Sequence, residues 1–254
     1  MTILLTNDDE IYAQGIYALY LQLKRIASVV VVAPDSEQSS VGHGITLSHP
    51  IWYKKVSRKG KFFGFGISGT PADCVKFAVS VILKKKPGMV ISGINAGPND
   101  GCSVFYSGTV AGAREGALLG IPSMAVSLAT FLNPDFSYAA QCAAKLAKTF
   151  LQRGIPKGTF LNVNVPAVKS SRIKGFKITC QCTDPIHSSF RKHKDPHLRD
   201  YYWMTGRAPT KKKDMTIDTY AVNNNYVTVT PVCSDSTDYA FLGKLTEEFL
   251  NLKK

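Results

Sequence analysis

The sequence lacks long hydrophobic runs, C-x-x-C cysteine pairs and any surplus of acidic residues. Its longest apolar stretch, residues 29–33, is too short to cross a membrane, and no basic leader precedes the first strand-like segment. We therefore expect no signal peptide, no membrane partner and a cytoplasmic location. The six cysteines match no common zinc-finger spacing, and a chain of 254 residues can build a core without disulfides, so we expect reduced thiols.

Positive charge, in contrast, is in clear excess, with a formal net charge of +13 at pH 7. The basic residues gather in three places, residues 54–61, 84–86 and 191–213. Such a surface attracts anions, and both small phosphorylated molecules and nucleic acid fit that description. No nucleic-acid-binding motif accompanies the clusters. We therefore predict a small anionic ligand and do not expect nucleic acid as a partner.

Short apolar segments alternate with helical patterns through the first two thirds of the chain. Predicted strands cover residues 3–5, 29–33, 46–53, 62–67, 89–91, 123–127 and 159–165. Predicted helices follow Asp9 and cover residues 71–83, 108–119 and 136–151. This alternation predicts an α/β fold with a mostly parallel sheet flanked by helices and wound by right-handed crossovers.

The character of the sequence changes near residue 169. Strand-like pieces at residues 175–182, 216–222 and 226–232 surround a polar, basic and aromatic stretch, residues 183–214. A long structureless loop is improbable inside a compact domain, so we expect an extended β-hairpin arm that carries a subunit contact. A last helix is predicted over residues 237–250. We assign residues 1–168 to a catalytic core and residues 169–254 to a C-terminal oligomerisation region that is not an independent domain.

Polar side chains follow three of the predicted strands. Asp8 and Asp9 come after the first strand, Ser39 after the second, and Asn95 and Asn99 after the strand at residues 89–91. The carboxyl ends of parallel strands meet at one edge of a sheet, where ligands bind. Adjacent carboxylates repel each other unless a cation neutralises them, and an all-oxygen donor set favours Mg²⁺, Mn²⁺ or Ca²⁺. The alternative is that Asp8 and Asp9 only turn the chain and cap the next helix.

A hydroxyl- and glycine-rich segment, Ser107-Gly108-Thr109, opens the helix predicted at residues 108–119. Free N–H groups and the dipole at a helix start bind phosphate, and the two hydroxyl groups add donors; an ordinary N-cap is the alternative. Residues 64–69 also match the dinucleotide pattern G-x-G-x-x-G. They do not lie in the first βα turn, and a lysine run replaces the acidic residue expected about twenty positions later, so we predict no dinucleotide site.

Several blocks together resemble the signature of one family, the SurE stationary-phase survival proteins, which are metal-dependent 5′-nucleotidases. The blocks are Leu4–Asp9, Ala33–Pro34 with Gln38–Ser40, Ser68–Cys74, Ser92–Asn95, Tyr106–Val110 and Leu161–Pro166. They occur in order up to about residue 166, and residues 228–231 fit the C-terminal part.

The resemblance implies a Rossmann-like core, an extended C-terminal hairpin, and a homodimer or homotetramer. It also implies a divalent-metal-dependent phosphomonoesterase that hydrolyses nucleoside 5′-monophosphates, with some activity on 3′-nucleotides or short polyphosphate. One Mg²⁺ or Mn²⁺ ion per subunit is implied. Matching motif to motif gives the metal ligands as Asp8, Asp9, Ser39 and Asn95, with Asp8 and Asp9 catalytic. The implied phosphate-binding residues are Asn95, Asn99, Ser107, Gly108 and Thr109.

One position departs from the family pattern, because Glu10 stands where the family usually has glycine after the two aspartates. Glycine in such a turn often supplies a positive φ or a close backbone approach. Glu10 therefore puts the activity in question rather than the fold. The competing hypothesis is a non-catalytic sensor that binds nucleotides or polyphosphate through its basic surface.

Overall fold

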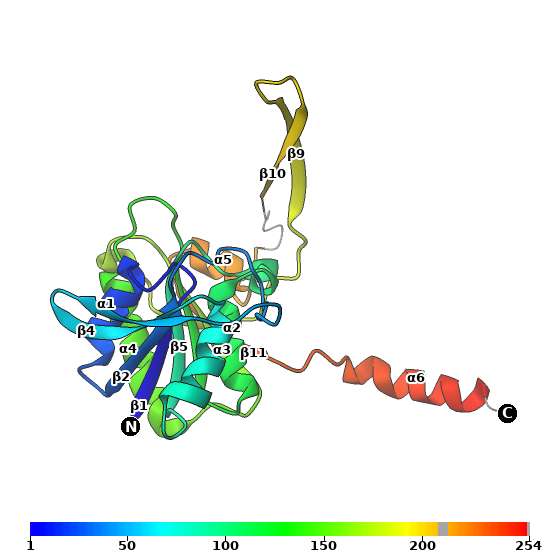
Figure 1. Ribbon diagram of the computed structural model, residues 1–254. Coiled ribbons are helices and arrows are strands. Elements are labelled where there is room, and N and C mark those ends of the chain that lie inside the picture. The colour runs from blue at the N-terminus through cyan, green and yellow to red at the C-terminus, as the bar shows by residue number, and fades with distance from the viewer. Residues whose placement is uncertain (208–212, 253–254) are drawn as a thin grey trace.

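The structure is a computed structural model of the chain and describes residues 1–207 and 213–252. A sheet with the strand order β3-β4-β2-β1-β5-β6-β7-β11-β8 forms its centre (Figure 1). Its strands are β1 (Thr2–Thr6), β2 (Ser28–Pro34), β3 (Tyr53–Arg58), β4 (Lys61–Ile67), β5 (Met89–Ala96), β6 (Ser123–Leu128), β7 (Thr159–Val165), β8 (Phe176–Ile178) and β11 (Val227–Cys233).

The sheet is parallel from β4 through β7, which confirms the predicted α/β fold. Antiparallel strands border this parallel part, since β3 runs against β4 and β11 runs against β7. The last strand, β8, pairs parallel to β11. The carboxyl ends of β1, β2, β5, β6 and β7 therefore meet at one edge.

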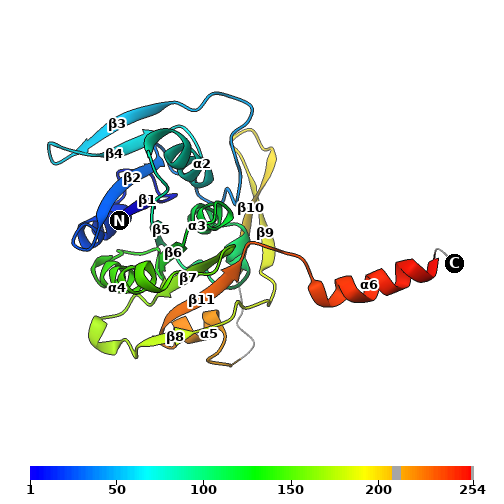
Figure 2. The ribbon, with the colours of Figure 1, turned by 90° about the horizontal axis from the view of Figure 1, so that it is seen from below.

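Helices cover both faces of the sheet (Figure 2). On one face lie α1 (Gln14–Leu23) and α4 (Ser137–Arg153), and on the other lie α2 (Pro71–Phe77) and α3 (Gly108–Leu118). In β1, Ile3 and Leu5 pack with residues of α1 and α4, whereas Leu4 packs with residues of α2, and all three are fully buried. Burial on both faces explains why this strand is continuously apolar.

The C-terminal region sends two elements away from the sheet. The antiparallel strands β9 (His187–Lys194) and β10 (Asp200–Arg207) form the extended hairpin that the sequence predicted, and α6 (Tyr239–Leu252) is the predicted last helix (Figure 1). In the described part of the chain, every helix is too short or too polar to pass through a bilayer. The division of the chain at residue 168 stays a prediction.

Several predicted elements were wrong. Residues 46–52 are irregular, because the Asp73 carboxylate rather than a neighbouring strand binds the Thr46 N–H, at 3.1 and 3.2 Å. The basic cluster at residues 54–61 consequently lies on the β3–β4 hairpin itself. Residues 216–222 form no strand but mostly belong to the helix α5 (Asp218–Asn223). The predicted helix at 71–83 is a shorter α2 followed by a π-helix at Ala78–Ile82, and Lys211 and Lys212 lie outside the described residues.

Candidate active site

Asp8 lies in the turn after β1, against the start of α3. Its side chain is 5% exposed, and the Thr109 hydroxyl donates a hydrogen bond to Asp8 Oδ1. A Cβ atom at position 108 would lie only 2.9 Å from Asp8 Cβ and 3.1 Å from Asp8 Oδ2. Glycine at this position therefore lets the first turn of α3 approach the carboxylate closely. The structure brings Asp8, Gly108 and Thr109 together, with the positive end of the helix dipole beside a negative charge.

Asp9 faces the end of β5. The backbone N–H of Ala96 donates to Asp9 Oδ2 at 3.4 Å, which places Asp9 beside Asn95, the preceding residue in the chain. The Nδ2 atom of Asn95 donates to the carbonyl oxygen of Gly97 at 2.8 Å. Because this bond uses the amide nitrogen, the amide oxygen is the Asn95 atom with the chemistry of a metal ligand.

The loop after β2 reaches the same place through its backbone. The N–H of Gln38 donates to the carbonyl oxygen of Asp8 at 2.8 Å, which fixes the loop against the aspartate turn. Ser39 is exposed, and its hydroxyl donates to the carboxylate of Glu37. The structure thus brings the Ser39 segment to Asp8 while the Ser39 hydroxyl is bound to Glu37.

Ser107 acts as the N-cap of α3. Its Oγ atom accepts a hydrogen bond from the N–H of Val110 at 3.1 Å, which satisfies one of the unpaired donors at the helix start. The capping interpretation of this serine is therefore correct. A further role in binding phosphate stays a prediction.

Asn99 lies in a buried cage of polar side chains, and its hydrogen-bond partners among the residues that the structure describes include neither aspartate. Its N–H donates to Asn164 Oδ1 at 2.8 Å, and its carbonyl oxygen accepts from Asn162 Nδ2 at 2.7 Å. Its own Nδ2 donates to the Ser127 hydroxyl at 2.8 Å. Sequence reasoning did not assign a role to Asn162 and Asn164. Their signal is the alternation of two amides with apolar residues, which puts both on one face of β7.

A buried ion cluster also escaped sequence reasoning. The Glu115 side chain on α3 is 4% exposed and binds His43 Nε2 at 2.9 Å and Lys76 Nζ at 2.8 Å. Burial alone would raise the pKa of Glu115, but the hydrogen bonds from His43 and Lys76 lower it below its usual value. His43 follows Ser39 in the same loop, so the cluster ties this loop to α2 and α3. The available signal was one carboxylate within a helix of small residues.

The two aspartates have strongly perturbed proton affinities. Burial raises the pKa of Asp8, against the opposing hydrogen bond from Thr109. Burial, followed by the charge of Asp8, raises the pKa of Asp9 from 3.8 to about 7. The pair therefore holds a proton near neutral pH unless positive charge replaces it.

The donors at this edge fit a hard divalent cation. They comprise two carboxylates, an amide and a hydroxyl, the oxygen chemistry that Mg²⁺ and Mn²⁺ prefer. Within residues 1–207 and 213–252, no three His, Cys, Asp or Glu side chains are grouped to hold a metal ion, so neutral oxygen donors must complete such a site. The Oδ1 atom of Asn7, which precedes Asp8, is a buried acceptor without a hydrogen-bond partner among these residues.

Glu10 adopts the backbone conformation that the family's glycine suggests. Its φ is 74°, and its carbonyl oxygen accepts from Asn7 Nδ2 at 2.7 Å, which closes the aspartate turn. A non-glycine residue in this region costs about 1–2 kcal/mol. The turn therefore forms with a side chain at position 10, and the placement of Asp8 and Asp9 is preserved at the cost of local strain.

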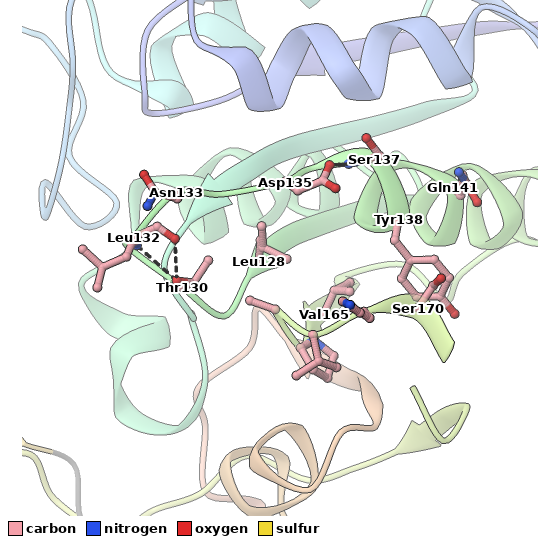
Figure 3. A pocket seen from close by; sticks show the side chains of 14 residues that line it. Leu128, Thr130, Leu132, Asn133, Asp135, Ser137, Tyr138, Gln141, Val165 and Ser170 are labelled. Carbon is pink, nitrogen blue, oxygen red and sulfur yellow. Dashed lines mark hydrogen bonds between the residues drawn. The ribbon is translucent and has the colours of Figure 1, made fainter. Parts of the chain in front are cut away.

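A separate pocket of ≈ 440 Å³ lies beyond the ends of β6 and β7 (Figure 3). Its wall includes Leu128, Leu132, Tyr138 and Val165. None of the predicted site residues lines it. The candidate site is therefore the Asp8–Asp9 edge and not this pocket.

The fold and this site define an α/β protein that presents paired carboxylates and a helix start at the carboxyl edge of a parallel sheet. The family model described as Survival protein SurE matches residues 3–188. The chain belongs to the SurE family.

Named relatives agree with this membership over almost the full chain. The 5′-nucleotidase SurE of Syntrophobacter fumaroxidans is 45% identical over 96% of this chain and 98% of its own length. The 5′-nucleotidase SurE of Chlorobaculum tepidum is 44% identical over 96% of this chain and 92% of its own length. The crystal structure of the SurE protein from Aquifex aeolicus is 40% identical, covers both chains completely and superposes with a TM-score of 0.86.

Proposed function

We propose that this protein is a 5′-nucleotidase that depends on a divalent cation and hydrolyses nucleoside monophosphates to nucleoside and phosphate. Relatives with this name align over nearly the full chain and support the activity. The observation that carries the proposal at the site is the convergence of Asp8, Asp9 and the start of α3 at one edge of the sheet. Activity on 3′-nucleotides and short polyphosphate belongs to the same proposal.

Asp8, Asp9, Ser39 and Asn95 would hold one Mg²⁺ or Mn²⁺ ion. When bound, such an ion neutralises charge on the phosphate and makes water a stronger nucleophile. For Ser39, binding requires its hydroxyl to turn from Glu37, which is a rotation about one side-chain bond. The raised pKa values of both aspartates support the proposal, because a cation would replace the proton that the pair otherwise holds.

The chain's own residues would do the remaining work. The N–H groups at Gly108 and Thr109 would bind the phosphate oxygens, with the Ser107 hydroxyl close by. Asp8 or Asp9 would orient the attacking water and accept its proton. Thr109 would orient Asp8 through its hydrogen bond, and Asn95 and Asn99 would also bind the phosphate.

Direct attack by an aspartate carboxylate is the covalent alternative. Trapping in an acid-quenched single turnover separates the two routes. Attack by aspartate forms a bond from the carboxylate oxygen to phosphorus as the nucleoside leaves, so a phosphoaspartyl peptide is detected by mass spectrometry. Attack by water forms no such covalent species at any time in the turnover.

We further propose a cytoplasmic protein that associates as a homodimer or homotetramer through the C-terminal hairpin and α6. Exposed apolar residues on these elements support this, among them Trp203, Met204, Phe249 and Leu250. Apolar patches of this kind are typical of protein–protein contacts.

A phosphate-release assay tests the function. Purified protein is incubated with AMP or GMP and Mg²⁺, Mn²⁺ or a chelator. The proposal predicts release that requires the metal and stops with chelator. Tight nucleotide binding without release would instead identify the sensor, and this outcome would overturn the proposed hydrolysis.

A further inference from the structure

One exposed aromatic ring packs against the segment that follows Asn95, a residue proposed to hold the cation. Phe131 belongs to the loop that joins β6 to α4, and 75% of it is exposed. Its contact is with the segment that follows Asn95: a Cβ atom at position 97 would lie 2.1 Å from Cε1 of the Phe131 ring. Gly97 therefore leaves the room in which the ring packs, and the rest of the ring stays accessible to solvent.

The contact places Phe131 close to the residues proposed to hold the cation. Gly97 accepts the hydrogen bond from Asn95 Nδ2 at 2.8 Å, and Ala96 between them donates to Asp9. The N–H of Gly97 also bonds to the carbonyl oxygen of Leu128 at the end of β6, at 2.9 Å. The ends of β5 and β6 are thus joined where the ring packs, one residue along the chain from the N–H group that binds Asp9.

The loop holds this arrangement through a compact turn. The Thr130 hydroxyl accepts from the N–H of Leu132 and donates to its carbonyl oxygen, both at 3.1 Å. The turn spans Phe131, and the side chains of Phe131 and Leu132 have different surroundings. The Phe131 ring packs on Gly97. Leu132, 81% exposed, lines the pocket beyond β6 and β7, which Phe131 does not line (Figure 3).

We propose that Phe131 is the stacking platform for the base of the nucleotide substrate. This inference rests on the proposed nucleotidase function and names the part of the substrate that Phe131 contacts. With phosphate at the start of α3 and the cation, the base would lie one sugar away. Phe131 is an exposed ring that packs on the segment next to Asn95, which would bring it within reach of the base. Stacking on a single ring tolerates every base, because each has a π-face. The platform therefore predicts broad base tolerance, with the larger purines bound more tightly.

The test compares AMP with ribose 5-phosphate, which keeps the phosphate and the sugar but has no base. Phe131→Ala should raise KM for AMP by about 5- to 100-fold and leave kcat/KM for ribose 5-phosphate within about twofold. Phe131→Trp keeps an aromatic face at this position and should therefore keep the wild-type preference for AMP over ribose 5-phosphate. The matched control is Leu132→Ala, an equally exposed apolar truncation one residue away, which should leave both substrates unchanged.

A second variant separates stacking from packing. Phe131→Leu keeps an apolar side chain over Gly97 but removes the π-face, so it should behave like Phe131→Ala. Wild-type behaviour of Phe131→Leu, or an equal loss on both substrates in Phe131→Ala, would overturn the inference.

Failure of the nucleotidase proposal gives a different result, because the wild-type protein would then release phosphate from neither substrate. Equilibrium binding of AMP and ribose 5-phosphate in the presence of Mg²⁺, measured by calorimetry on the same variants, tests the platform in that case. A loss of AMP affinity in Phe131→Ala and Phe131→Leu, but not in Leu132→Ala, would support base stacking on Phe131. Equal affinities of Phe131→Ala and the wild type for AMP would contradict it.

Discussion

The carboxyl edge of the sheet buries polar side chains, whereas the C-terminal elements, the β9–β10 hairpin and α6, expose apolar ones. At the edge, polar groups are buried, and most find a partner within the chain: Asp8 with Thr109, Asp9 with Ala96, and Asn99 with its asparagine cage. On the hairpin and α6, large apolar side chains such as Trp203 and Phe249 are more than half exposed. The first region thus pairs most of its polar groups within the chain, whereas the second exposes apolar side chains that would suit the association proposed above.

The largest expected effect is at the edge. Asp8→Asn removes one of the two charges proposed to bind the cation while keeping the size of the side chain, so phosphate release from AMP should fall at least about 10²-fold. Steady-state assays with Mn²⁺ measure it. The control variant is Asp195→Asn, which changes an aspartate on the exposed hairpin and should have nearly wild-type activity. Full activity of Asp8→Asn would remove the basis for the ligand assignment.

The next effect compares the buried carboxylate of Glu115 with the exposed carboxylate of Asp200 on the hairpin. Glu115→Gln leaves His43 and Lys76 without their shared buried carboxylate and should lower the free energy of unfolding by about 1–3 kcal/mol. Asp200→Asn breaks the exposed pairs with Lys192 and Lys194 on the hairpin and should cost less than about 1 kcal/mol. Urea unfolding of both variants gives the numbers. Equal costs would mean that burial of Glu115 contributes little.

A smaller effect depends on pH. The pKa of Asp9 in the folded protein is about 7 against 3.8 in an ordinary environment, so the folded state binds the proton more tightly. Stability from this group is therefore full below about pH 4 and is lost as pH rises through 7. In metal-free protein, Asp9→Asn should match the wild type at pH 4 and exceed it by about 1–2 kcal/mol at pH 8, after allowance for solvent screening.

Thermal unfolding in EDTA at pH 4, 6 and 8 measures this difference. Saturating Mn²⁺ should reverse its sign at pH 8, because the wild type alone keeps both carboxylates. A difference that does not change with pH would contradict the raised pKa of Asp9.

The smallest effect on the core is expected at the C-terminus. A chain ending at residue 236 lacks α6, which makes few contacts with the sheet, so the unfolding free energy of the core should change by less than about 0.5 kcal/mol. Light scattering should nevertheless show a lower association state if α6 takes part in assembly. An unchanged association state would restrict the proposed contact to the hairpin.

Much of the fold was predictable because local and global signals agree. Buried parallel strands such as Ile3–Leu5 have an unambiguous apolar pattern, and the helix that opens at Gly108 has clear start signals. The strands wrongly predicted at residues 46–53 and 216–222 lie where side chains replace sheet partners. Asp73 binds the first segment, and the buried Asp218 carboxylate accepts three backbone N–H groups near the second.

The candidate site was predictable only in part. Adjacent aspartates after a predicted strand indicate where along the chain a site lies. In the structure, Asp8 contacts the start of α3 and Asp9 contacts the end of β5. Contacts between distant segments have no local signature, so the links from Glu115 to His43 and from Asn162 to Asn99 were not predicted. The direction of the Ser39 hydroxyl could not be predicted either, because it depends on its hydrogen bond to the Glu37 carboxylate.

The reversed direction of β11 determines the side of the sheet from which the chain leaves toward α6. Because β11 runs against β7, it ends beside the start of that strand, where the Ser234 N–H donates to the carbonyl oxygen of Gly158 at 2.7 Å. The chain therefore departs toward α6 from the side of the sheet opposite the carboxylates. If α6 binds a neighbouring copy, as proposed above, that contact would form on the side of the sheet away from the candidate site, and substrate could reach the carboxylates without displacing it.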